Sequence, residues 1–67
     1  METEITFMWK DQNSIVGDCP ALYRAPGGYV VQGKIIGPGT HSQLRQLGED
    51  ETAVFVPDNV IDRIKEG

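Results

Sequence analysis

Apolar residues alternate with others at the start of the chain. Ile5, Phe7 and Trp9 are separated by single residues, which is the period-two pattern of a strand with one buried face. We therefore predict a first strand over about residues 3–9. The polar segment 10–14 and the pair Gly17-Asp18 predict a loop after it, in which Ile15 and Val16 are expected to fold back onto the core.

A β-hairpin is predicted from residue 19 to residue 36. Pro26, Gly27 and Gly28 fit a three-residue type I turn with Gly28 in the left-handed conformation. That turn places Ala25 opposite Tyr29, and the next pairs are Tyr23 with Val31, Ala21 with Gly33, and Cys19 with Ile35. We expect this mostly apolar side to face the core. The assignment depends on the turn, because a two-residue loop would shift the register.

The opposite side of the predicted hairpin is mixed in character. It carries Leu22, Arg24, Val30, Gln32, Lys34 and Ile36. An apolar patch rimmed by polar groups marks binding sites, and a central arginine is a typical anchor. We therefore take Leu22, Arg24, Val30, Gln32 and Lys34 as candidate contacts with a partner. The alternative is that a helix or the first strand covers this side within the monomer.

Glycine and proline divide the second half of the chain. The segment Gly37-Pro38-Gly39 ends the third strand, and Thr40 with Gln43 fits a capping box that starts a short helix. Leu44 and Leu47 are its expected apolar contacts, and Gly48 follows where helices commonly stop.

A short strand and a final helix are predicted at the C-terminal end. Residues 53–56 form an apolar run typical of a strand, and Pro57-Asp58 is a suitable start for a helix. Val60, Ile61 and Ile64 then line one face. The predicted order is β-β-β-α-β-α, an α+β fold in which two short helices cover an antiparallel sheet of three or four strands.

The length of 67 residues predicts a single small domain spanning residues 1–67. A chain this short buries only roughly 60% of the surface that it exposes when unfolded. Self-association into a homodimer is therefore a further expectation, because it is a common way for small scaffolds to bury more apolar surface.

The charge balance narrows the classes of partner. The net charge is −4, and the six basic residues are scattered along the chain. This argues against direct binding to nucleic acid or to an anionic membrane surface. The start, Met1-Glu2-Thr3-Glu4, lacks the features of a secretion signal, so we expect a cytoplasmic location.

The residues capable of chemistry are few. Cys19 is the single cysteine, which excludes an internal disulfide and a thiolate zinc cluster, and we predict a buried structural role for it. His41 and Ser42 are adjacent on the predicted helix and point in different directions, so they do not suit a nucleophile and its base. The acidic segment 49–51 lacks the spacing of a calcium loop. We expect no enzyme activity, metal or cofactor.

Four segments of the chain are distinctive in combination: Trp9 with Asn13-Ser14, residues 19–23, residues 28–33 and residues 53–57. Together they resemble a group of small uncharacterised actinobacterial proteins that are often encoded beside helix-turn-helix regulators of the Xre class. The outline is also loosely similar to the BldB-like domain, from which the turn at 26–28 and the segment 40–47 depart. The first resemblance implies an accessory role beside a DNA-binding regulator.

The sequence thus predicts a non-enzymatic interaction module whose partner is a protein, with a helix-turn-helix regulator as the specific expectation. Two alternatives stay open. One is a thiol-dependent or small-molecule-binding protein centred on Cys19. The other is an acidic inhibitor that mimics DNA and blocks a nucleic-acid-binding protein.

Overall fold

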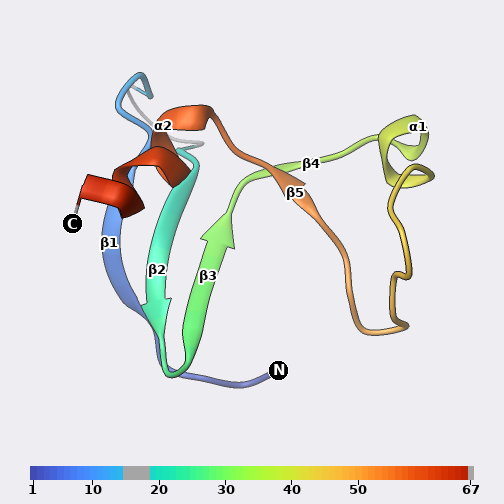
Figure 1. Ribbon diagram of the computed structural model, residues 1–67, viewed down its shortest axis with the longest axis horizontal. Helices are drawn as coiled ribbons and strands as arrows, with labels where there is room; N and C mark the ends of the chain where they lie inside the picture. The colour runs from blue at the N-terminus through green and yellow to red at the C-terminus, as the bar shows by residue number, and fades with distance from the viewer. Residues whose placement is uncertain (15–18, 67) are drawn as a thin grey trace.

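Two antiparallel sheets and two short helices make up the fold (Figure 1). The computed structural model describes residues 1–14 and 19–66, so the expectation for Ile15 and Val16 lies outside the described residues. The first sheet has the order β1-β2-β3 and the second pairs β4 with β5. The strands are β1 (Thr6–Lys10), β2 (Ala21–Ala25), β3 (Gly28–Gln32), β4 (Lys34–Ile35) and β5 (Val54–Phe55). The helices are α1 (Pro38–His41) and α2 (Asp58–Asp62), and a 3-10 turn, η1 (Arg63–Glu66), extends α2. The predicted α+β class is confirmed.

The hairpin between β2 and β3 has a two-residue loop, so the predicted register is wrong. Ala25 pairs with Gly28, and Arg24 pairs with Tyr29. Gly27 has a φ of 79°, which matches the second corner of a type II turn that has proline at its first corner. The left-handed residue is thus Gly27 and not Gly28, which shortens the loop by one residue and moves every cross-strand pair.

The corrected register redistributes the side chains between the two faces. Leu22 pairs with Val31 and Tyr23 pairs with Val30. Because directly opposed residues share a face, one face carries Leu22, Arg24, Tyr29 and Val31. The other carries Ala21, Tyr23, Ala25, Val30 and Gln32.

Strand β1 contains a β-bulge that also separates residues predicted to lie together. Phe7 pairs with Tyr23 and Trp9 pairs with Leu22, so β1 advances two residues where β2 advances one. Met8 is the extra residue. A bulge interrupts the alternation of faces, and as a result Phe7 and Trp9 lie on opposite faces of the sheet.

The predicted third strand breaks at Gly33. β3 ends at Gln32, and β4 pairs with β5 as a separate ribbon. A Cβ added to Gly33 would collide with the backbone oxygen of Phe55 and lie 2.7 Å from Cγ1 of Val56. Glycine is needed here because the segment around β5 crosses directly over the chain as it leaves the sheet.

The first helix is shorter and earlier than predicted. It starts after Gly37 with Pro38 in its first turn, and it spans only four residues. Thr40 lies inside it, so the predicted capping box is wrong. Gln46 has a positive φ of 54°, which is incompatible with a helix continuing to Leu47. Leu47 is 40% exposed and takes no part in the core.

Helix α2 packs against β2 and supplies the C-terminal part of the core. Val60 and Leu22 are both fully buried. Ile61 was predicted to share the apolar face but is 42% exposed. Figure 1 shows α2 and η1 at the end of the sheet where β1 stops and β2 begins, so the helix covers one end of the sheet rather than its whole face.

Candidate functional site

A buried carboxylate joins the end of β1 to helix α2. Asp11 is only 7% exposed and is the buried charged residue of the described chain. Its oxygens accept hydrogen bonds from Nδ2 of Asn59 at 2.7 Å, from Oγ of Ser14 at 2.9 Å and from the backbone N–H of Asn13 at 3.1 Å. Its own N–H donates to the carbonyl of Pro20 at 2.7 Å. The carboxylate therefore has a donor for both oxygens and joins its own loop to α2, and the backbone N–H of Asp11 connects this loop to Pro20.

The same hydrogen bonds set the ionisation of Asp11. The pKa of this carboxyl is lowered from 3.8, chiefly by the bond from Asn59 and then by the amide of Asn13. Burial opposes the shift, and Ser14 and the positive charge of Arg63 add to it. A carboxylate held ionised by donors is suited to fastening the structure, whereas a proton-transfer group needs a pKa near the working pH.

Arg63 closes the cluster from the other side. Its guanidinium lies 5.4 Å from the centre of the Trp9 ring and donates to Oδ1 of Asn59 at 3.0 Å. It also donates to the backbone carbonyl of Lys10. The Trp9 indole in turn donates to the carbonyl of Val60 at 2.8 Å. These contacts hold α2 and η1 against the end of β1.

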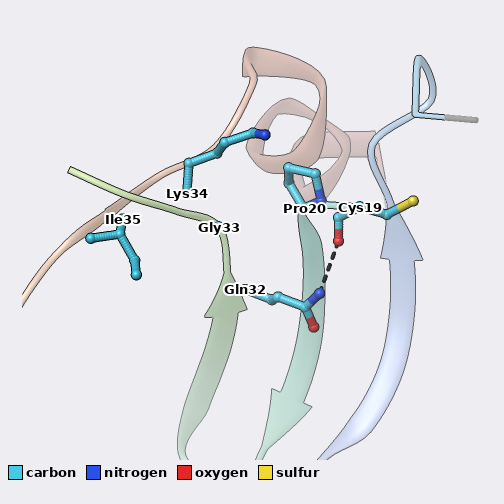
Figure 2. Close-up of a pocket in the computed structure, with 6 residues that line it drawn as sticks. All are labelled: Cys19, Pro20, Gln32, Gly33, Lys34 and Ile35. Carbon is cyan, nitrogen blue, oxygen red and sulfur yellow. Dashed lines mark hydrogen bonds between the residues drawn. The ribbon is translucent and has the colours of Figure 1, made fainter. Parts of the chain in front are cut away.

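Two shallow grooves flank the chain at Lys34 and Ile35. The first has a volume of about 370 Å³ and is lined by Cys19, Pro20, Gln32, Gly33, Lys34 and Ile35 (Figure 2). The second, of about 460 Å³, shares Pro20, Lys34 and Ile35 and adds residues from the Asp11 loop, α1 and the β5 region.

Cys19 is half-buried at the rim of the first groove. Its carbonyl accepts a hydrogen bond from Nε2 of Gln32 at 3.0 Å, and Oη of Tyr23 donates to Oε1 of Gln32 at 2.7 Å. Figure 2 shows the sulfur pointing away from Gln32 and Lys34. The backbone carbonyl of Cys19 therefore takes part in the hydrogen bonds at this groove. The thiol points away from Lys34, whose positive charge could otherwise activate it.

The five predicted partner contacts do not form one surface. Leu22 is completely buried and is part of the core. Arg24 is exposed on the same face, where it lies 4.7 Å from the centre of the Tyr29 ring and donates to the carbonyl of Gly28 at 2.7 Å. Val30 and Gln32 belong to the opposite face, and Lys34 lies in the ribbon.

The face opposite α2 carries a pair of aromatic rings, Phe7 and Tyr23, that the sequence did not indicate would meet. We call Phe7, Tyr23, Val30 and Gln32 the open sheet face. Phe7 is 58% exposed, and its ring meets that of Tyr23 edge to face with 5.8 Å between centroids. The bulge at Met8 brings Phe7 onto this face, and a sequence pattern carries no signal for a bulge at that position.

The ribbon is a second exposed apolar region. Ile35 is 94% exposed, Phe55 is 60% exposed and Val54 is 39% exposed. Ile35 was predicted to face the core on the side shared with Cys19, and that prediction is wrong.

The remaining candidate groups are scattered. His41 and Ser42 are exposed, and the Ser42 hydroxyl donates to the carbonyl of Gly39 at 2.9 Å. Glu51 folds back to accept the N–H of Gly48 at 2.8 Å. Within residues 1–14 and 19–66, no three histidine, cysteine or acidic side chains gather as metal ligands. None of the helices in these ranges has the length and apolar character needed to cross a membrane.

Comparisons of the chain with protein-family models, with curated proteins and with solved structures find no significant match.

Proposed function

We propose that this chain is a non-enzymatic interaction module that binds a protein partner through the open sheet face. The observation that carries the proposal is the pair of aromatic rings on this face, in which Phe7 is exposed and Tyr23 is half-buried. Aromatic side chains supply large contact areas at interfaces, and they are enriched among the residues that dominate binding energy. Gln32 stands beside them as a polar rim and is oriented by Tyr23.

The partner that suits this acidic chain is a basic protein, and specifically a DNA-binding regulator of the helix-turn-helix class. The net charge of −4 attracts a positively charged protein and repels nucleic acid. DNA-binding domains carry the positive charge that complements the net negative charge of the chain. The resemblance to proteins encoded beside such regulators supports the same class of partner.

The test is affinity capture of the tagged chain from its native host at physiological salt, with mass spectrometry of what is retained. We expect a helix-turn-helix regulator in amounts comparable to the tagged chain, and binding of the purified regulator that weakens as salt rises. Recovery of the chain without any regulator contradicts the proposal.

A pair of matched variants locates the contact. Phe7→Glu places a charge on the open sheet face and should abolish capture, whereas Tyr29→Glu places the same charge on the face that carries Arg24 and should retain it. Both positions are exposed, 58% and 44%, so circular dichroism of both variants should match the parent protein. Equal capture by the two variants places the contact elsewhere.

A further inference from the structure

The ribbon of β4 and β5 stands alone as a two-stranded sheet. Each strand spans only two residues, and within the described ranges no third strand pairs with either of them. Isolated two-stranded ribbons are marginally stable in water, and a third strand or a packed helix is usually needed. Ile35 nevertheless presents 94% of its surface to solvent at this place.

The ribbon is nevertheless held in a defined position. The backbone of Phe55 lies directly against Gly33, and the side chains of Val54 and Val56 flank the same point. Figure 1 shows the ribbon leaving the end of β3 and leading to α1. Its strand edges are therefore presented at a fixed place beside the main sheet, which reduces the entropy lost when another strand is added.

We propose that a second copy of this chain supplies the missing strand, by antiparallel pairing of its β4 with β4 of the first copy about a two-fold axis at Ile35. The result is a continuous four-stranded sheet in the order β5-β4-β4-β5. This contact uses a different surface from the open sheet face, so it is independent of the proposed regulator binding.

The charges favour β4 as the paired edge. With the axis at Ile35, the two Ile35 side chains stand opposite each other, and each Lys34 stands opposite Ile36 of the other copy. No like charges then face each other across the pair. Pairing through β5 would instead bring the acidic segment 49–51 of each copy toward Asp58 of the other, and like charges in opposed positions are destabilising.

The apolar surface also matches this arrangement. Ile35 pairs with Val54 in the ribbon, so the four-stranded sheet carries an unbroken row of Val54, Ile35, Ile35 and Val54 on one face. The buried hydrophobic core of the described ranges consists of Ala21, Leu22, Ala25 and Val60. A core this small benefits from additional burial. Because the strands are short, the interface is small and the expected dissociation constant is micromolar.

Sedimentation equilibrium over concentrations that bracket the micromolar range tests the dimer. The average mass should rise from 7.4 kDa toward twice that value. Ile35→Glu places two carboxylates opposite each other and should raise the dissociation constant more than about ten-fold. The control is Ile61→Glu, an exposed isoleucine on α2 that should dimerise like the parent protein. A mass of 7.4 kDa at every concentration, or an Ile35→Glu variant that dimerises normally, overturns the proposal.

Cross-linking tests the register. Directly opposed residues of an antiparallel pair have Cα atoms about 4.5–5.5 Å apart, within the range that a disulfide spans. In a Cys19→Ser background, Ile35→Cys should oxidise rapidly to a covalent dimer, and Ile61→Cys should not. Equal oxidation at the two positions contradicts pairing at Ile35. If the Ile35→Glu variant is monomeric and still captures the regulator, the β4 edge and the open sheet face act separately.

Discussion

The indole nitrogen of Trp9 donates a 2.8 Å hydrogen bond to the backbone carbonyl of Val60, 51 positions further along the chain. This bond joins the end of β1 to helix α2, and Arg63 covers the same indole ring. The junction combines the fully buried Val60 side chain with a satisfied polar contact. It is therefore the place where the end of β1 is joined to α2 and η1.

Removing the indole donor should destabilise the protein without changing its fold. Trp9→Phe keeps an aromatic ring but leaves the Val60 carbonyl without its partner, and we expect a loss of about 1–2 kcal/mol in the free energy of unfolding. Urea unfolding measures this loss. It is followed by circular dichroism because Trp9 is the single tryptophan, and its removal leaves no tryptophan fluorescence to follow. Phe7→Leu, at an exposed position, is the control and should change the midpoint little.

The Asp11 cluster should make stability depend on pH. Because the pKa of Asp11 is lowered from 3.8 in the folded protein, the ionised carboxylate stabilises the fold above that value. This stabilisation is lost as the pH falls through the lower, folded pKa. Asp11→Asn should therefore unfold at lower urea than the parent protein at neutral pH, and the difference should shrink in strong acid. A difference that is constant with pH would show that the charge of Asp11 does not contribute.

The two-residue hairpin loop can be tested with two glycine substitutions. Gly27→Ala forces a φ of 79° on an alanine, and we expect it to cost about 1 kcal/mol. Gly28→Ala has open space for its Cβ and no positive φ, so it should cost less. Thermal unfolding of both variants distinguishes the loops, because a three-residue loop would reverse the order.

Gly33 should tolerate no side chain. In Gly33→Ala the new Cβ meets the Phe55 backbone and lies 2.7 Å from Val56, and backbone atoms cannot move aside cheaply. We expect a loss of about 1–3 kcal/mol, together with shifted amide resonances for β4 and β5. Gly37→Ala, where nothing lies within 4 Å of the added Cβ, is the matched control. Unchanged ribbon resonances in Gly33→Ala would contradict the close crossing.

Leu22 should behave as a core residue. It is completely buried, so Leu22→Ala should cost about 2–5 kcal/mol, enough to leave a domain of this size largely unfolded. Val30→Ala, on the open sheet face, should cost clearly less. Similar urea midpoints for the two variants would place Leu22 on the surface, as the sequence-based register did.

Local signals predicted the elements better than they predicted their arrangement. The alternation before Trp9, a hairpin turn that begins at Pro26 and the start of α2 after Pro57 all correspond to elements of the fold, although the predicted turn was one residue too long. The predicted capping box at Thr40 is wrong, because the helix is capped at Gly37, three residues earlier, and the chain turns again at Gln46. A short polar segment contains several residues that could cap a helix, and contacts with the rest of the chain determine where the helix starts.

The candidate surface was harder to predict than the elements. A shift of one residue in the hairpin moved Val30 and Gln32 to the face opposite Leu22 and Arg24. The bulge at Met8 separated Phe7 from Trp9 in the same way. Both effects follow from the period of two along a strand, which turns a small error in register into a complete exchange of faces.

The sequence by itself determined the α+β class, the order of most elements, the acidic charge and the small number of reactive side chains. Only the tertiary structure decided which side chains are exposed. Gly33 separates the ribbon from the main sheet because a crossing strand occupies the space of its missing Cβ. Ile35 consequently stands in solvent and Leu22 in the core, although both are apolar residues in strand-forming segments. Burial depends on what packs against a residue, and this is settled by contacts between distant segments.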